Sequence, residues 1–291
     1  MNKKIRLFII LFFLICFANL SKSLALDLKI PKTDDEWDKA IESLNWVEGP
    51  KNLNFNDANS KINISDRFTI LEGADANQWL YWSNGIEFPE IKIYAIDEIE
   101  GSQYMFSYVD SGYVKTDDWT NVDPKEFLKE ITENYKASNS ERENSGMPIV
   151  VDVKWKKKPF LDNNYSSVYY ALEIGWSDNQ NTTQATALIL GRDGYTSAQY
   201  VAGENGYQET MLTNLSKIHT FNATKQYKDW KSGDKVAALG IGALLASTLG
   251  IKSLKPALFT TIMLLLKKLW FLIFLPFIFI GKLFTGSSKK K

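Results

Sequence analysis

The chain has 291 residues, of which 34 are basic and 34 acidic, so its formal net charge is zero, and it contains one cysteine. Four basic residues lie in residues 1–25 and eight lie beyond residue 235, so residues 26–235 keep 22 basic residues against all 34 acidic ones, a net charge of −12. A segment this acidic repels nucleic acid and anionic lipid headgroups, which argues against a nucleic-acid partner; the plainer interpretation, that the charge serves solubility, stays open.

Residues 1–25 have the layout of a signal peptide, with three basic residues before an apolar run over residues 7–17. Ser23 and Ala25 then place small residues three and one positions before a cleavage site after Ala25. An uncleaved anchor is the weaker alternative, because the run is shorter than the roughly 20 residues that span a bilayer. Cys16 would leave with the leader, so the mature chain would hold no disulfide, thiolate nucleophile or cysteine-bound metal.

The first elements expected after the leader are two short helices and a pair of strands. Thr33 followed by Glu36 forms a capping box that begins one helix, and residues 76–82 predict the second. Residues 91–96 and 103–109 are typical of strands, and the turn between them favours an antiparallel pair.

The third predicted helix begins after Asp123, which is suited to cap it. Pro124 fits the first helical position and Glu126 completes a capping-box pattern. Its apolar face is formed by residues at helical spacing: Phe127, Leu128, Ile131 and Tyr135. The polar residues 136–146 that follow are the one place within residues 26–235 where a domain boundary is plausible.

Beyond residue 148 the pattern changes to strands, predicted at residues 149–155, 168–176, 183–190 and 196–201 with turn-rich stretches between them. Residues 211–219 suit a further helix. Runs of strands with interspersed helices predict an exported α+β domain over residues 26–235, with a mainly antiparallel sheet and a few packed helices.

Residues 236–291 are predicted to form a C-terminal membrane anchor with a basic tail. Residues 236–251 carry no charge, and as a helix they would reach about 24 Å, a little short of a hydrocarbon core of about 30 Å. Small residues recur there at every fourth position, which allows close approach of membrane helices but which chance could also produce: Ala238, Gly242, Ala246 and Gly250.

A second apolar run covers residues 257–280 but holds Lys267 and Lys268 in its middle, where each lysine would cost about 3 kcal/mol at the bilayer centre. Keeping every tail lysine in the cytoplasm favours one crossing, at residues 236–255, with residues 269–284 at the interface or re-entrant. A two-crossing hairpin is the alternative. The main domain is then expected on the outer, periplasmic side of the cell membrane, with the bilayer as partner of the tail.

Three acidic residues follow a Gly-Tyr turn at Tyr113. Asp117, Asp118 and Asp123 could together bind calcium or act as acid and base, but their spacing matches no calcium loop. A plainer interpretation makes Asp123 a helix cap and places Asp117 and Asp118 in a strand-to-helix turn. Tyr113, Asp117 and Asp118 remain candidates for a binding site.

Arg192 is the fourth binding candidate, between two predicted strands and beside Gly191 and Gly194. A hairpin turn with an arginine–carboxylate pair is the plainer interpretation, and binding of an anionic ligand is the sharper one. His219 is the single histidine and has no partner motif, so no catalytic residue is assigned. The lysines around Trp155 suit lipid headgroups or an acidic partner or, more simply, a solvated edge strand: Lys154, Lys156, Lys157 and Lys158.

Several short motifs, in order along nearly the whole mature chain, resemble those of a bacterial family of membrane-anchored proteins classified as a domain of unknown function (family 2167). The matching residues are Trp46, Gly49, Pro50, Gly112, Tyr113, Val114, Asp117, Asp118, Asp123, Asn139, Arg142, Gly146, Trp155, Pro159, Gly191, Arg192, Gly194, Tyr227, Asp234, Lys235, Ala237 and Gly240. The chain departs from the family where Phe160, Leu161 and Asp162 replace a usual tyrosine–aspartate pair. The resemblance implies an exported domain with a C-terminal membrane anchor, and it implies no activity.

No phosphate-binding loop, dinucleotide fingerprint, zinc spacing or serine elbow is present in the sequence, so no cofactor or metal is expected and the enzyme interpretation has no positive support. We therefore expect a non-catalytic binding or assembly module whose partner is a membrane or envelope protein. One rival is a ligand-binding sensor with Arg192 or the Asp117 region at the mouth of a pocket. The other is a hydrolase, in which Asp117, Asp118 and Asp123 would converge in one cleft.

Overall fold

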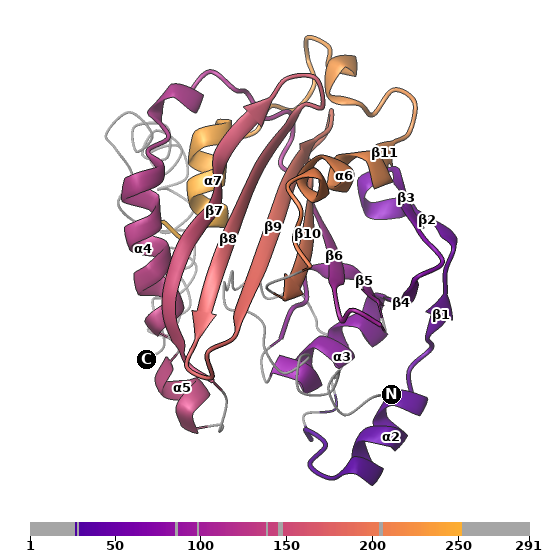
Figure 1. Ribbon diagram of the computed structural model, residues 1–291. Coiled ribbons are helices and arrows are strands. Elements are labelled where there is room, and N and C mark those ends of the chain that lie inside the picture. The colour runs from indigo at the N-terminus through magenta and orange to yellow at the C-terminus, as the bar shows by residue number, and fades with distance from the viewer. Residues whose placement is uncertain are drawn as a thin grey trace, which may run out of the picture.

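The computed structural model describes residues 27, 29–84, 87–97, 99–137, 139–144, 148–203 and 206–251. The predicted leader and the apolar run over residues 257–280 therefore lie outside the described residues. Within the described residues the chain is an α+β fold, with a large antiparallel sheet and helices on both of its faces (Figure 1).

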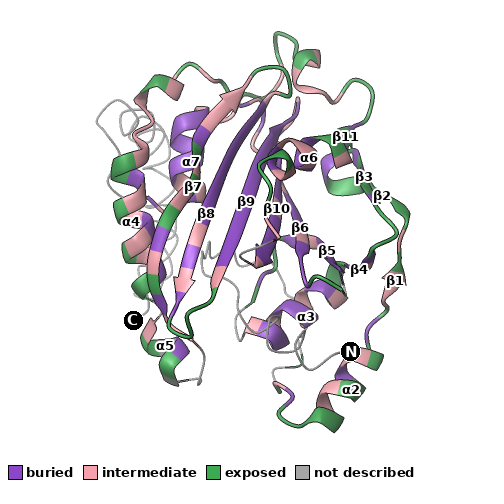
Figure 2. Ribbon diagram, viewed as in Figure 1, coloured by how far each residue is buried: buried purple, intermediate pink, exposed green. Residues whose placement is uncertain are grey.

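Eight strands of the described chain make up the large sheet, and each pairs antiparallel with its neighbours. In spatial order they are β1 (Val47–Glu48), β4 (Phe68–Glu72), β5 (Ile91–Asp97), β6 (Gln103–Val109), β10 (Tyr195–Gly203), β9 (Asn181–Leu190), β8 (Ser167–Trp176) and β7 (Val150–Asp162). The predicted β5–β6 pair and the four predicted strands after residue 148 are all confirmed. Because both faces of the central strands are covered, the central strands are buried along most of their length (Figure 2).

Alternate residues of each central strand feed two separate hydrophobic cores. On β8, Tyr170 and Leu172 face the first core, whereas Tyr169 faces the second. The first core is closed by residues from four helices: α2 (Asp34–Glu42), α3 (Gly73–Asn84), α4 (Pro124–Ala137) and α7 (Ile241–Thr248). The second is closed by α6 (Thr210–Ile218) and a small sheet of three strands in the order β11 (His219–Phe221), β3 (Ser60–Ile64) and β2 (Lys51–Phe55), with the 3₁₀ turn η1 (Asn56–Ala58) between β2 and β3.

The predicted helix caps are confirmed. Thr33 accepts a hydrogen bond from the backbone nitrogen of Glu36 at 3.2 Å, and the Glu36 carboxylate accepts one from the backbone nitrogen of Thr33 at 3.3 Å, which makes the capping box of α2. Asp123 Oδ1 accepts bonds from the backbone nitrogens of Lys125 and Glu126 and so caps α4.

The polar stretch over residues 136–146 lies within the fold. The last residues of α4 and the short helix α5 (Asn139–Asn144) occupy it. The Asn139 side-chain amide donates to Val150 O at 2.8 Å and accepts from Val150 N at 2.9 Å. It thus forms the two hydrogen bonds that a residue of a neighbouring strand would form with the first residue of β7. Arg142 donates to Pro148 O at 2.8 Å and lies 4.5 Å from the centre of the Trp176 ring. These contacts fasten α5 to the large sheet.

Residues 236–251 are placed differently from the predicted membrane crossing. Helix α7 is eight residues long, and Ile241, Leu244 and Leu245 are buried in the first core. Ala238 lies before the helix. Gly250 lies beyond its end at φ +71°, where its N–H bonds Ser247 O and the next N–H bonds Ala246 O in a Schellman motif.

The four small residues at every fourth position therefore do not form one helical stripe: Gly242 and Ala246 are core positions, and Gly250 ends the helix. Within the described ranges, no helix is long and apolar enough to cross a bilayer. Small residues at every fourth position fit a helix buried in the core of a domain as well as a helix in a membrane, because both pack closely against a neighbour.

Candidate functional site

The predicted site residues come together around the segment that leads into α7. Three stretches far apart in sequence meet here: the loop after β6 (residues 110–118), the turn between β9 and β10 (residues 191–194) and residues 224–243. We call this group of contacts the C-terminal clasp. Three of the four binding candidates make these contacts: Tyr113, Asp118 and Arg192, together with several other residues on which the family resemblance rests. The fourth, Asp117, lies in the same loop and is exposed.

The backbone of the clasp is a short parallel pairing next to Gly112. Tyr113 donates its N–H to Lys235 O at 2.9 Å, and Ala237 returns an N–H to Tyr113 O at 2.9 Å. Gly112 has φ +87°, and a β-carbon there would lie 2.8 Å from Lys235 O, so the close approach requires glycine. Two further residues extend the pairing, because Ile241 donates to Lys115 O at 2.8 Å.

Arg192 forms a two-point ion pair with Asp234. Its Nε and Nη2 each lie 2.7 Å from a carboxylate oxygen of Asp234, and both side chains are about one-fifth exposed. The guanidinium of Arg192, and then the backbone N–H of Lys231, lower the pKa of Asp234 to about 2. The arginine–carboxylate pair at this hairpin turn is confirmed, with a partner 42 residues away in sequence.

A second ion pair supports the same turn. Lys225 Nζ lies 2.6 Å from Asp193 Oδ2, and Arg192 N donates to Lys225 O at 2.9 Å. Gly194 lies so close to the end of β6 that a β-carbon there would be 2.1 Å from Val109 O, and this position of the turn therefore requires glycine. The turn between β9 and β10 is therefore fixed to residues 224–234 by both side chains and backbone.

Tyr113 belongs to a stack of three aromatic rings. Its ring lies 4.4 Å from that of Tyr227 at an interplanar angle of 15°, and 5.0 Å from that of Trp230 at 29°. The Tyr227 hydroxyl donates to Val114 O at 2.7 Å, and burial raises the pKa of this tyrosine. Tyr227 lies in the 3₁₀ turn η3 (Tyr227–Asp229). The Tyr113 ring is thus a packing surface for residues 227–230.

Asp118 caps α7, although it lies far from that helix in sequence. Its Oδ1 accepts a hydrogen bond from Gly242 N at 3.0 Å and its Oδ2 one from Ala243 N at 3.1 Å. A carboxylate at a helix N-terminus satisfies otherwise unpaired N–H groups and suits the positive end of the helix dipole. A β-carbon on Gly240 would lie 2.5 Å from this carboxyl group, so glycine there leaves space for Asp118.

The three acids that the hydrolase interpretation requires to converge lie in different environments. Asp118 caps α7, Asp123 caps α4, and Asp117 is exposed. In the part of the chain that the structure describes, no three His, Cys, Asp or Glu side chains lie close enough to hold a metal ion. The predicted strand-to-helix turn is present, since the 3₁₀ turn η2 (Trp119–Asn121) follows Asp118.

His219 is buried next to Thr196 and Phe221. Nε2 lies 3.0 Å from Thr196 Oγ1, the ring packs edge-on against Phe221, and only 4 % of the residue is exposed. Burial lowers the pKa of His219 to about 3, so it is neutral at pH 7. A histidine so enclosed cannot reach a substrate.

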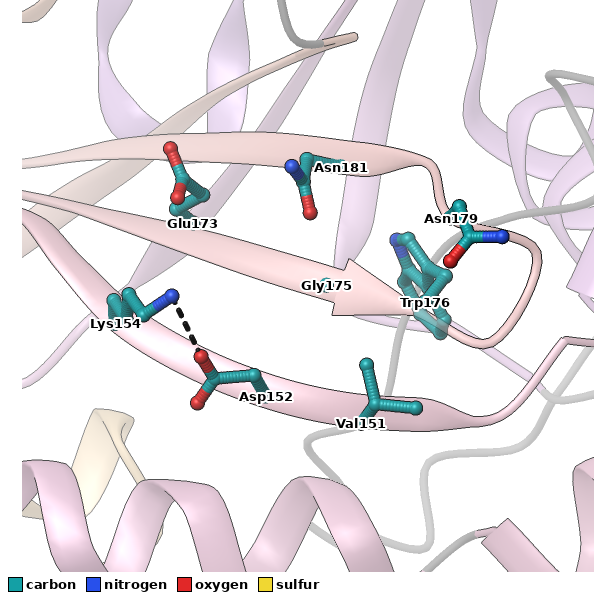
Figure 3. A pocket seen from close by; sticks show the side chains of 8 residues that line it. All are labelled: Val151, Asp152, Lys154, Glu173, Gly175, Trp176, Asn179 and Asn181. Carbon is teal, nitrogen blue, oxygen red and sulfur yellow. Dashed lines mark ion pairs between the residues drawn. The ribbon is translucent and has the colours of Figure 1, made fainter.

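A shallow hollow of about 310 Å³ lies on the ends of β7, β8 and β9 (Figure 3). It is lined by Val151, Asp152, Lys154, Glu173, Gly175, Trp176, Asn179 and Asn181. Its charged groups pair with lysines of β7: Asp152 with Lys154 at 2.8 Å, and Glu173 with Lys156 at 2.6 Å. Neither Arg192 nor Asp117 lines this hollow.

The lysines near Trp155 lie on an edge strand, as the plainer interpretation predicted. Strand β7 is the last of the large sheet, and its register with β8 shifts at three places. Besides the two pairs above, Lys157 pairs with Glu209. Paired lysines and irregular register both discourage the addition of a foreign strand to this edge.

Sequence reasoning missed Trp230 and the roles of Tyr227 and Asp234, although the last two were among the family motifs. The only signal was that their motifs occur in a fixed order with those of Tyr113 and Arg192, because pairing across 42 to 124 residues leaves no local pattern.

The fold and the clasp together define an α+β domain in which helix α7 and the residues leading into it are fastened to the first core. A family model described as "Protein of unknown function (DUF2167)" matches residues 47–278, most of the chain, and the chain belongs to this family. No curated protein matches the sequence. Among solved structures, the chain is similar to the solution structure of cyanobacterial PsbP (CyanoP) from Synechocystis sp. PCC 6803, at 10% identity and a TM-score of 0.33, over 62% of this chain and 92% of that one.

Proposed function

We propose that the protein is a non-catalytic binding or assembly module, held on the outer side of the cell membrane by its C-terminal segment. One observation carries the proposal: the polar groups of the clasp are occupied by one another. Arg192 is taken up by Asp234, and Asp118 by the N–H groups of α7. Such groups fix a segment of chain, and they are not presented to a substrate.

Three features of the sequence support the anchor and its side. The signal-peptide layout of residues 1–25 favours export. Ile241, Leu244, Leu245, Leu249 and Ile251 belong to the first core, which leaves residues 257–280, with Lys267 and Lys268 at the membrane interface, as the apolar segment available to the bilayer. The family model extends through residue 278 and so includes most of this segment.

The test compares the full chain with a chain that ends after Pro256. Membranes carrying each version are separated from the soluble fraction, treated with a crosslinker, and solubilised for mass spectrometry. We expect the full chain to stay with membranes after a high-salt wash and to capture a specific envelope protein, and the shortened chain to be soluble. The control is a chain whose residues after Pro256 are replaced by a Gly/Ser tail. A full chain that washes off the membranes, or that captures no protein beyond those captured by this control, would contradict the proposal.

A further inference from the structure

The hollow at the ends of β7, β8 and β9 has a floor without a side chain. Gly175 of β8 lies between its two partners in register, Asp152 on β7 and Asn181 on β9 (Figure 3). Alternation along β8 places Gly175 on the same face as Tyr169, whose hydroxyl donates to Ser216 of α6 at 2.7 Å. Gly175 lies further along that face, near the end of the strand, where the hollow opens.

The fold does not require a glycine at position 175. Its φ lies outside the left-handed region that favours glycine. A β-carbon there would lie 3.3 Å from Asn181 Oδ1 and 3.5 Å from a methyl group of Val151, and the partly exposed Asn181 side chain can move slightly to admit it. Glycine is less favourable than alanine in a strand. A strand glycine that neither backbone nor packing demands marks a place where another molecule approaches closely.

The walls of the hollow present polar groups that are not engaged. Neither the side-chain amide of Asn179 nor that of Asn181 has a hydrogen-bond partner among the described residues. Each amide offers both donors and an acceptor. Glu173 bonds Lys156 through Oε2 at 2.6 Å, and in the described chain its Oε1 forms no hydrogen bond. These groups are available to a ligand.

Trp176 and the turn that follows it fix the end of the hollow. The Trp176 indole donates to Thr182 Oγ1 at 2.8 Å, and the guanidinium of Arg142 lies 4.5 Å from the centre of its ring. Asn179 N donates to Trp176 O at 3.1 Å, which holds the turn. A site whose walls are already fixed loses little conformational entropy when a ligand binds.

Charge and size restrict the ligand. The two acids of the hollow, Asp152 and Glu173, are each paired with a lysine, so a neutral ligand leaves no charge uncompensated. Val151, 48 % exposed, is the one exposed large apolar side chain among the lining residues, which does not suit an apolar ligand. The volume of about 310 Å³ is at the lower end of the range of roughly 300–1,000 Å³ for small-molecule sites.

We propose that the hollow binds one ring of a neutral saccharide. Hydroxyl groups both donate and accept, as the amides of Asn179 and Asn181 do, and they can donate to Glu173 Oε1. Gly175 leaves room for the ring to lie close to the sheet. This inference goes beyond the proposed function and does not depend on the anchor, because every residue it uses is described. A free sugar and an envelope glycan share this chemistry, and the test distinguishes them.

The test measures saturation transfer by NMR from the full chain to dissolved sugars. The chain is purified in a phosphocholine detergent, so that no detergent sugar competes. Glucose and N-acetylglucosamine are the single-ring probes, maltotriose and chitotriose are the corresponding chains, and acetate and citrate are the anionic comparison. We expect transfer to at least one sugar and none to the anions. Tighter binding of a chain than of its single ring supports a glycan, and equal binding supports a free sugar.

No transfer to any of these sugars, or transfer to the anions alone, would overturn the proposal. Gly175→Ala fills the floor, so we expect the dissociation constant to rise roughly tenfold or more, while the thermal midpoint stays unchanged or increases. Asn181→Ala should also weaken binding, and it replaces Gly175→Ala if that variant folds poorly. Asn52→Ala, at an exposed asparagine of β2 outside the hollow, is the matched control and should not alter binding. Unchanged affinity in the folded hollow variants would refute the site.

Discussion

The carboxylate of Asp118 lies 3.0 Å from the backbone nitrogen of Gly242, 124 residues further along the chain, and caps a helix to which it does not belong. We expect Asp118→Ala to lower the free energy of unfolding by about 1–2 kcal/mol, the usual effect of losing a cap. Asp118→Asn, which keeps one acceptor, should cost less. Urea denaturation followed by tryptophan fluorescence measures both.

The neighbouring acid provides the matched control. Asp117 is exposed, so Asp117→Ala should change the free energy of unfolding by no more than about 0.5 kcal/mol. Equal losses from Asp117→Ala and Asp118→Ala would show that the local charge, and not the cap on α7, is responsible.

The pairing of Arg192 with Asp234 predicts that Asp234 stays deprotonated to a lower pH than an ordinary aspartate. The pKa of Asp234 is lowered to about 2, so the pair contributes stability above the ordinary pKa of 3.8 and loses it as the pH falls through 2. In Arg192→Gln the pKa of Asp234 should rise toward its ordinary value, because the largest cause of the shift is gone. Carbon-detected NMR titration of the aspartate side chains measures it, and an unchanged Asp234 pKa would refute the pairing. Lys225→Gln, at the neighbouring pair, should leave it nearly unchanged.

His219 predicts a pH dependence of stability at moderately acid pH. Its pKa is lowered from 6.5 to about 3, so between these values the unfolded chain binds a proton that the folded chain does not. The free energy of unfolding should therefore fall by about 1.4 kcal/mol per pH unit as the pH decreases through this window, and the full contribution is present above pH 6.5.

Replacement of His219 by glutamine isolates this effect. His219→Gln removes the titrating group and can keep a bond to Thr196, so its denaturation midpoints should depend less on pH between 6.5 and 4 than those of the unchanged protein. Carboxylates such as Asp234 titrate lower and alike in both. Parallel pH profiles would mean that His219 is protonated in the folded state.

The burial of α7 predicts where the chain tolerates a stop codon. A chain that ends after Lys235 loses Ile241, Leu244 and Leu245 from the first core, each worth about 1.5–3 kcal/mol, against a typical total stability of 5–15 kcal/mol. We expect this version to aggregate or be degraded, and the version ending after Pro256 to unfold cooperatively. Circular dichroism and thermal melts distinguish them, and a cooperative melt of the shorter version would place α7 outside the core.

Much of the fold could be predicted because its signals are local. The capping box at Thr33, the cap at Asp123 with Pro124 after it, and the turn-separated strands after residue 148 each depend on residues within a few positions of one another. The small sheet was missed, although residues 60–64 alternate buried and exposed side chains in the pattern of a strand. Five-residue strands next to polar turns are easily taken for loops.

The site could be predicted only in part, for a different reason. Arg192 was correctly placed in a hairpin turn with a carboxylate partner, but nothing near it in sequence identifies Asp234. Residues 236–251 were assigned to the membrane because hydropathy measures only how favourable it is for side chains to leave water. It does not distinguish a bilayer from the face of a sheet, and here the sheet provides the cover.

Helix α7 also sets the order in which the molecule can be completed. A polypeptide is made from its N-terminus, and every strand of the described sheet precedes α7 in sequence. Until residue 251 has emerged, the sheet side that α7 covers lies open to chaperones, to proteases and to other unfinished chains. A chain interrupted before residue 251 therefore differs from a longer one by an accessible apolar surface, which chaperones and proteases can bind.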